Sequence, residues 1–356
     1  MTGGGAVGGW VLGVDSGGSG LRVALAPAAD PSSALTTASR EPVRTGPAGI
    51  DAAHLLEQLL PMARALLERA RSTGTGDSPP APGTDGGAGG AAGPAAVAIG
   101  AAGMATLGDD LRAVLPGALE AAFGVRRLAL AADAVTAYAG AIGQRPGAVV
   151  AAGTGMIAIG TDLTGWRRAD GWGHLLGDCG GGAWIGRAGL EAAMRGHDGR
   201  RGGSAALLAR LEAVFGPADE LPGLLYPRSD RPALLASFAP EVARCAADDP
   251  VAARILAGAA DDIAAAAAAV CPPPSAGSCE VALTGGLFKM GDPLLVPLRE
   301  ALSAQLPHAR PVSAAGDPLN GSLTLAAALA TDSLTLPRDP RMLRVTAPSD
   351  DADQDT

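Results

Sequence analysis

Two carboxylates and an indole lie within one glycine-rich stretch near the middle of the chain. The stretch runs from Asp170 to Gly182 and contains Trp172, Asp178 and six glycines. So many glycines indicate a backbone that approaches a neighbour closely or takes positive φ. An indole can pack against the apolar face of a sugar, and a carboxylate accepts hydrogen bonds from hydroxyl groups. The stretch therefore fits a sugar site, and it fits equally a glycine-rich turn in which Asp178 caps the helix expected from about residue 183.

Three short glycine turns, each next to an apolar strand-like run, are candidate phosphate sites. Asp15 precedes the first turn, and the other two lie at 153–155 and 284–286. Backbone amides in such turns can bind phosphate oxygens, and Asp15 can hold Mg²⁺ through water. Neither the Walker nor the Rossmann spacing is present, and each turn alone fits a hairpin with an Asx cap. Together they predict one nucleotide held between two lobes. The nucleotide-binding candidates are Asp15, Gly17, Gly18, Ser19, Gly153, Thr154, Gly155, Thr284, Gly285 and Gly286.

A further carboxylate, Asp133, lies at an expected junction between a strand at 128–132 and a helix at 134–142. Ligands meet α/β sheets at such junctions, and a carboxylate there can accept a proton from a substrate hydroxyl. Asp133 can also cap the helix that follows it. Both roles are compatible with one residue.

The elements that must position these residues repeat one arrangement. Strands at 10–15 and 21–26 flank the first glycine turn, and strands at 148–152 and 156–161 flank the second. A strand, a helix and a strand follow the first hairpin, over 97–132, in the order of a crossover unit. The recurrence predicts two related α/β lobes.

The lobe boundaries follow from this order. We expect an N-terminal lobe over 1–134, onto which a closing helix at about 318–331 packs back, and a C-terminal lobe over 135–317. The composition of 72–94, mostly Gly, Pro, Ser, Thr, Ala and Asp, predicts a disordered loop. The end of the chain, 337–356, is expected to be a disordered acidic tail.

Composition excludes several classes of function. The net charge of −9 and the absence of a basic stripe argue against nucleic-acid binding. No apolar run reaches the length of a membrane span, and no secretory leader is evident. The four cysteines lack CxxC or CxxH spacing, so neither a zinc site nor a disulfide framework is expected. We therefore expect a cytoplasmic protein that has no nucleic-acid or membrane partner.

In this order the motifs resemble those of the acetate and sugar kinase/Hsp70/actin ATPase superfamily, and within it the BadF/BadG/BcrA/BcrD group that includes N-acetylglucosamine kinase. The resemblance spans about residues 10–330. Residues 13–19 match the first phosphate motif, 151–155 the second, 283–288 the adenosine motif and 316–321 the second connecting segment. The resemblance implies an α/β, two-lobed actin-like ATPase (ribonuclease H-like) fold with a ligand cleft between the lobes.

The resemblance also implies a function. It indicates an ATP-dependent kinase that phosphorylates the C6 hydroxyl of N-acetylglucosamine or glucosamine, with ATP and Mg²⁺ as cofactors and a homodimer as the assembly. Asp133 takes the position of the general base, and Asp15 that of the metal-binding carboxylate. The sugar loop falls on Trp172, Gly173 and Asp178.

The chain departs from the family pattern at one position, and two other classes of protein have to be considered. The family usually carries an asparagine after a Gly–Pro pair, where this chain has Gly49, so glucosamine, N-acetylglucosamine and muramic acid derivatives all stay open. An ATP-driven electron-transfer activator, of the 2-hydroxyacyl-CoA dehydratase or benzoyl-CoA reductase type, carries a cluster-binding cysteine where this chain has Val150, and Cys179 is no substitute. A non-catalytic sugar sensor usually needs a DNA-binding module, and we expect none before the first hairpin.

Overall fold

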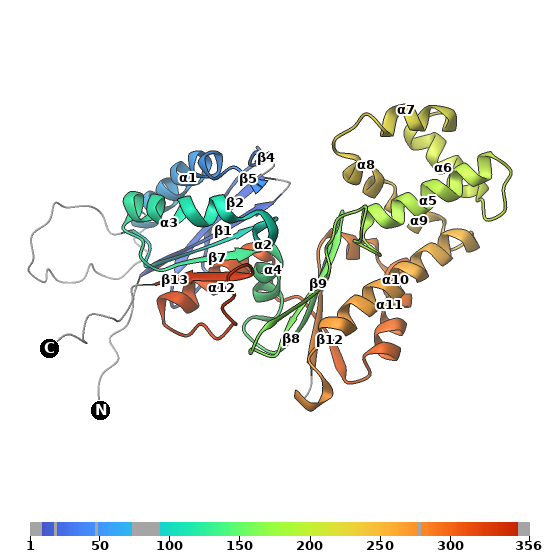
Figure 1. Cartoon of the computed structure of the whole chain (residues 1–356). Helices are drawn as coiled ribbons and strands as arrows, with labels where there is room; N and C mark the ends of the chain where they lie inside the picture. Colours follow the sequence, from blue (N-terminus) through green and yellow to red (C-terminus); the bar gives the residue numbers. More distant parts are fainter. Residues whose placement is uncertain (1–8, 18–19, 47–48, 73–92, 277–278, 348–356) are drawn as a thin grey trace, which may run out of the picture. The chain divides into compact units, whose positions relative to one another are not determined.

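The computed structural model of the chain describes residues 9–17, 20–46, 49–72, 93–276 and 279–347. The chain divides into two compact units, and each has its own sheet (Figure 1). The first unit comprises 1–144, 163–165 and 315–356, and the second comprises 145–162 and 166–314.

The first unit is built on a six-stranded sheet in the order β13-β7-β6-β1-β2-β3. The hairpin β1–β2 and strand β3 are antiparallel, whereas β6 pairs in parallel with β1, and β7 with β6. Every residue of β6 and β7 is buried, as in parallel strands covered on both faces. The strands are β1 (Trp10–Gly17), β2 (Gly20–Pro27), β3 (Leu35–Ser39), β6 (Ala96–Ala101), β7 (Leu128–Ala132) and β13 (Leu343–Thr346), with a separate pair β4 (Thr45–Gly46) and β5 (Gly49–Ile50).

Two helices of this unit, α4 (Asp133–Ile142) and α12 (Pro318–Ala330), pack with unusually close backbones. A Cβ atom on Gly321 would lie 1.8 Å from the carbonyl oxygen of Thr136, and one on Gly140 would lie 2.1 Å from that of Asp317. The unit therefore includes all of α4, and the boundary expected after residue 134 is wrong because it would separate two helices joined by glycine contacts. The remaining helices are α1 (Ala52–Ser72), α2 (Met104–Leu107) and α3 (Asp109–Phe123).

The contact between α4 and α12 predicts that Gly321→Ala destabilises the protein, and Gly117 in α3 supplies a contrasting control. Gly321→Ala forces a methyl group against backbone, and we expect it to lower the free energy of unfolding by about 1–3 kcal/mol. Gly117, inside α3, has no atom within 4 Å of an added Cβ. Gly117→Ala is therefore expected to raise that free energy by about 0.5–1 kcal/mol, because alanine favours the helix. Urea unfolding of both variants tests this, and a Gly321→Ala protein as stable as the unchanged chain would refute the close contact.

The second unit repeats the strand arrangement of the first. Its sheet has the order β10-β9-β8-β11-β12, in which β8, β9 and β10 are antiparallel, while β11 is parallel to both β8 and β12. In the first unit, β3-β2-β1-β6-β7 has the same order and the same strand directions. This confirms the two related α/β lobes predicted from the two hairpins. The strands are β8 (Gly147–Ala152), β9 (Met156–Thr161), β10 (Trp166–Asp170), β11 (Cys279–Thr284) and β12 (Ala309–Ser313).

The helices of the second unit form two groups. The alanine-rich α10 packs on β8, β9 and β10 and contacts α11 (Figure 1). The others gather around α5, which contacts α6, α8, α9 and α10. Residues 231–245 form two short helices, with Phe238 completely buried at their junction. The helices are α5 (Gly182–His197), α6 (Ala205–Phe215), α7 (Leu221–Leu225), α8 (Arg231–Ser237), α9 (Ala239–Cys245), α10 (Pro250–Val270) and α11 (Asp292–Gln305).

The expected acidic tail at 337–356 is partly structured. Its residues 343–346 form β13, which pairs antiparallel with β7 and buries Leu343 completely. The reason is that β7 would otherwise leave an unpaired sheet edge. Residues 348–356 and most of the loop expected at 72–94 lie outside the described residues.

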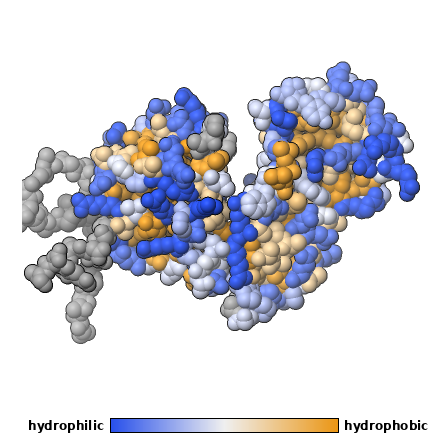
Figure 2. Space-filling view, viewed as in Figure 1, coloured by the Kyte–Doolittle hydropathy of each residue, from blue (hydrophilic) through white to orange (hydrophobic). Residues whose placement is uncertain are grey.

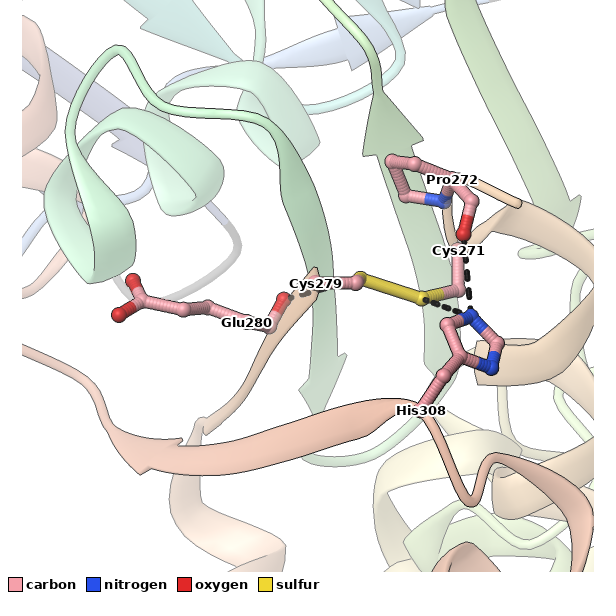
Figure 3. The surroundings of a disulfide bond; sticks show 5 residues. All are labelled: Cys271, Pro272, Cys279, Glu280 and His308. Atoms are coloured by element: carbon pink, nitrogen blue, oxygen red, sulfur yellow. Dashed lines mark hydrogen bonds between the residues drawn. A yellow bond between two sulfur atoms is a disulfide. The ribbon is translucent and has the colours of Figure 1, made fainter. Parts of the chain in front are cut away.

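One cysteine pair forms a disulfide that the cysteine spacing did not predict. Cys271, just after α10, and Cys279, the first residue of β11, form a disulfide (Figure 3). His308 Nε2 lies 3.2 Å from the carbonyl oxygen of Pro272 beside this bond. The two cysteines are separated by 8 positions, which matches neither of the cysteine spacings considered in the sequence. Among the helices described, none is long and apolar enough to span a bilayer.

Candidate functional site

The glycine-rich loop after β10 is folded around the carboxylate of Asp170. Both Asp170 and Asp178 have positive φ, at 59° and 56°. Asp170 Oδ1 accepts a hydrogen bond from the amide of Asp178 at 2.5 Å, and its Oδ2 accepts one from the amide of Cys179 at 2.9 Å. Asp178 Oδ1 accepts the amide of Gly173 at 3.0 Å. The two carboxylates thus hold both ends of the loop, and the capping role considered for Asp178 is taken by bonds within the loop.

Arg168 braces the same loop from β10. Its guanidinium donates to the carbonyl oxygens of Asp170 and Gly171, at 3.1 and 2.5 Å. Its Cζ lies 4.5 Å from the ring centroid of Trp172, a cation–π distance. The indole is 62% exposed and available to a ligand. Sequence reasoning missed Arg168, although its alternation with Asp170 places both on one face of β10.

The second glycine turn is joined to the start of α5. The amides of Gly182 and Ala183 donate to the carbonyl oxygens of Gly153 and Thr154, at 2.9 and 2.8 Å. A Cβ on Gly155 would lie 2.3 Å from Asp178 Oδ2. The glycines are therefore required by close approach, and the predicted phosphate turn lies directly against the predicted sugar loop.

The third glycine turn lies beside the second at one end of the sheet. Strands β8 and β11 are parallel, and the two turns follow their carboxyl ends. Gly285 has φ of 106°, and a Cβ there would lie 2.1 Å from the carbonyl oxygen of Ala152. The second unit thus brings together the predicted residues Gly153, Thr154, Gly155, Trp172, Gly173, Asp178, Thr284, Gly285 and Gly286.

In the first unit, Asp15 is paired with an arginine that sequence reasoning missed. Arg22 lies directly opposite on β2 and donates from Nε and Nη2 to Asp15 Oδ2, at 2.9 and 2.6 Å. Its Nη1 reaches Asp317 Oδ2 at 2.5 Å. Burial raises the pKa of Asp317, but the Asn320 amide and the Arg22 guanidinium outweigh it, so this pKa lies below 3.8. Arg22 therefore joins two carboxylates. Gly18 and Ser19 lie outside the described residues.

Asp133 is exposed at the first position of α4, immediately after β7. Its Oδ1 accepts the amide of Ala134 at 2.9 Å, while Ala132 holds the N-cap position. Because β1, β6 and β7 are parallel, Asp133 and Gly17 lie at the same edge of this sheet. The first unit thus gathers its predicted residues at the carboxyl ends of its parallel strands.

Gly49 is required by the backbone at its position. Its φ is 96°, and an added Cβ would lie 2.2 Å from the carbonyl oxygen of Leu107. An asparagine cannot be accommodated here without moving α2. The departure from the family pattern is therefore built into this part of the fold.

Two half-buried titratable groups of the loop have pKa values shifted in the same direction. Burial raises the pKa of Asp178 above 3.8, and the amide of Gly173 only partly offsets this effect. Burial also raises the pKa of the Cys179 thiol above 9.0, and nearby carboxylates add to the shift. The thiol therefore keeps its proton at neutral pH, which makes it a poor nucleophile and a poor metal ligand.

The raised pKa of Asp178 predicts a pH-dependent difference in stability. Because the folded protein binds this proton more tightly than the unfolded chain, ionised Asp178 destabilises the fold at neutral pH. Asp178→Asn is therefore expected to be at least as stable as the unchanged protein at pH 7. Its advantage should shrink as the pH falls through the raised pKa. Urea unfolding between pH 7 and 4 measures this, and a variant that is less stable at pH 7 would contradict it.

The family of the chain follows from comparison with known proteins. The model of the BadF/BadG/BcrA/BcrD ATPase family matches residues 12–321, most of the chain. The chain belongs to the BadF/BadG/BcrA/BcrD ATPase family. That range contains the described glycine turns, Asp15, Asp133 and the loop of Asp178.

Individual relatives of this BadF-type chain are sugar kinases by description. A structure from Chromobacterium violaceum, assigned as an N-acetylglucosamine kinase, is 28% identical with a TM-score of 0.61, covering 89% of this chain and 98% of that one. A similarly assigned Porphyromonas gingivalis structure shares 18% identity with a TM-score of 0.63, covering 90% and 99%. A Streptomyces griseus glucokinase of the ROK family, bound to glucose and AMPPNP, has a TM-score of 0.50 at 18% identity, covering 91% and 100%. These matches confirm the two-lobed actin-like ATPase fold.

One curated relative matches a shorter segment. An N-acetylmuramic acid/N-acetylglucosamine kinase of Clostridium acetobutylicum is 44% identical over 69 residues, which is 19% of this chain and 22% of that protein. The chain therefore matches about a fifth of that relative's length.

Proposed function

We propose that this protein is an ATP-dependent amino-sugar kinase that transfers the γ-phosphoryl group to the C6 hydroxyl of N-acetylglucosamine or glucosamine. The observation that carries the proposal is the contact of Asp178 with the turn at Gly155, because it joins a candidate sugar ligand to a candidate phosphate turn. The 28% identity to the Chromobacterium violaceum protein over nearly its full length supports the same activity.

Each predicted residue then has a role in a direct transfer. Asp178 accepts hydrogen bonds from sugar hydroxyls, and Trp172 packs against the ring. The amides of the glycine turns bind the phosphates. The C6 oxygen attacks the γ-phosphorus, the bond to the β–γ bridging oxygen breaks to release ADP, and Asp133 takes the hydroxyl proton. This transfer needs no covalent intermediate on the enzyme, so neither His174 nor Cys179 has to act as a nucleophile.

Magnesium fits the carboxylate of Asp15. Mg²⁺ keeps several waters and needs only one or two carboxylates in addition to phosphate oxygens. Among the described residues no three acidic, histidine or cysteine side chains gather as a complete metal cage. Asp15 lies near the end of β1, which runs to Gly17, and both of its bonds from Arg22 fall on Oδ2. Asp15 would hold the hydrated ion, which neutralises charge on the phosphates when bound.

The proposal is tested by ADP release with glucosamine, N-acetylglucosamine, glucose and N-acetylmuramic acid, each with and without Mg²⁺. N-acetylmuramic acid is included because the Clostridium acetobutylicum relative acts on it by description. We expect Mg²⁺-dependent turnover with one or more amino sugars. Phosphorus NMR of the product should show a phosphate on the C6 oxygen. Turnover with glucose alone, or binding of an acyl substrate alone, would overturn the assignment.

A further inference from the structure

A cavity of about 470 Å³ lies in the second unit next to the glycine-rich loop. Helices α5, α7 and α8 form its walls, and apolar side chains such as Leu190 and Leu235, both buried, form its floor. In Figure 2 this helical part of the unit shows apolar surface bordered by hydrophilic residues. Such a floor suits the carbon skeleton of a small ligand.

Arginines outnumber carboxylates in the lining of this cavity, and one of them, Arg200, also pairs with Asp198 at 3.7 Å. Four arginines line it against one carboxylate, that of Glu191, which lies 4.0 Å from the Arg187 guanidinium. Arg231 donates Nε to the carbonyl oxygen of Arg228. Within the described part of the chain, Arg195 forms no ion pair. Guanidinium groups bind carboxylates through paired hydrogen bonds, so the cavity favours an anion with an apolar stem. The four arginines are Arg187, Arg195, Arg200 and Arg231.

The cavity is continuous with the candidate sugar loop. His174 and Leu175 line it, and His174 directly follows Gly173, whose amide binds Asp178. Leu175 is 82% exposed. A group attached to a sugar at Asp178 and Trp172 therefore has a path along this loop into the cavity.

We propose that this cavity is the subsite for a carboxylate-bearing substituent on the amino sugar. The ligand class is acidic amino sugars whose ring carries a short ether- or amide-linked carboxylic acid. The stem contacts the apolar floor, and the carboxylate pairs with Arg187 and Arg231 on the rim. This inference rests on the proposed kinase function and adds the discrimination between acidic and neutral amino sugars.

The test uses two sugars that differ only in this substituent. N-acetylmuramic acid is N-acetylglucosamine with a lactyl ether, so the ratio of their kcat/KM values reports on the carboxylate. We expect Arg187→Met and Arg231→Met each to lower this ratio about 10- to 100-fold, the range for one lost charged hydrogen bond. Arg254→Met is the matched control, because Arg254 does not line this cavity, and the ratio should not change there. An unchanged ratio in both rim variants would overturn the proposal.

Two further measurements separate the remaining outcomes. Free lactate added to N-acetylglucosamine assays tests for an independent anion site. An effect of lactate on turnover, lost in Arg187→Met, without any preference for N-acetylmuramic acid would overturn the subsite. Calorimetry with N-acetylmuramic acid alone measures binding even if neither sugar is phosphorylated. Weaker binding in both rim variants would then support the subsite while the kinase assignment fails, and equal binding would overturn the subsite as well.

Discussion

Asp133→Asn is expected to lower turnover of the amino sugar by a factor of about 10² to 10⁴, the range for loss of a general base. Asparagine keeps the size and the acceptor for the Ala134 amide, but it cannot take the hydroxyl proton. Steady-state assays with the preferred sugar measure the loss, and calorimetry with a non-hydrolysable ATP analogue should show nearly unchanged nucleotide affinity.

The matched control for this change is Asp109→Asn. Asp109 is the first residue of α3, as Asp133 is of α4, so both changes remove one negative charge from a helix N-terminus. The control should retain full turnover. If Asp133→Asn also turned over at the unchanged rate, Asp133 would serve the helix alone and the base would have to be another residue.

Asp178→Asn is expected to lower kcat/KM for the amino sugar about 10- to 200-fold, equivalent to about 1.5–3 kcal/mol for a hydrogen bond to a charged group. Asparagine is the informative replacement, because Asp178 has φ of 56° and asparagine adopts this conformation more readily than alanine. The amide can still accept the Gly173 hydrogen bond, so the loop is preserved while the negative charge is lost.

The fold and the function should respond to Asp178→Asn in opposite directions. Stability at pH 7 is expected to hold or rise, since burial already opposes the charge, while activity falls. Asp261→Asn, an exposed carboxylate on α10, is the control and should leave both unchanged. A variant with unchanged kcat/KM for every amino sugar would exclude Asp178 from sugar binding.

Much of the fold was predictable because the spacing of apolar residues and the positions of the glycine turns indicate the same strand and helix boundaries. Strands β1, β2, β8 and β9 and helices α3, α5 and α12 appear within one or two residues of their predicted ranges. Strands β10, β12 and β13 were missed, since each lies at a sheet edge and is too short or too polar to give a clear alternation. The pairing of β12 and β13 depends on neighbours distant in sequence, whereas β10 pairs with β9, the strand directly before it.

Some residues of the candidate site could likewise be predicted from the sequence, and others could not. Asp15 and Asp133 follow from residue type and from their position near strand ends, and Asp178 follows from its place in the glycine-rich stretch. The pairing of Arg22 with Asp15 follows from the register of β1 with β2, which the strands expected at 10–15 and 21–26 did not fix. The clamp at Asp170 could not be predicted either, because it depends on how a positive-φ loop folds back on its own amides.

The contact between Gly155 and Asp178 also limits how this enzyme can diversify. A larger residue at 155 would displace the carboxylate, and a longer acid at 178 would press on the turn. Neither position can therefore change alone without affecting the other, and improved variants should emerge only as paired substitutions. Selection for new acceptors should instead act through the cavity rim, where Arg187 and Arg231 can vary without disturbing that contact. A mutant library restricted to the rim should accordingly yield more active clones than one spread over the loop.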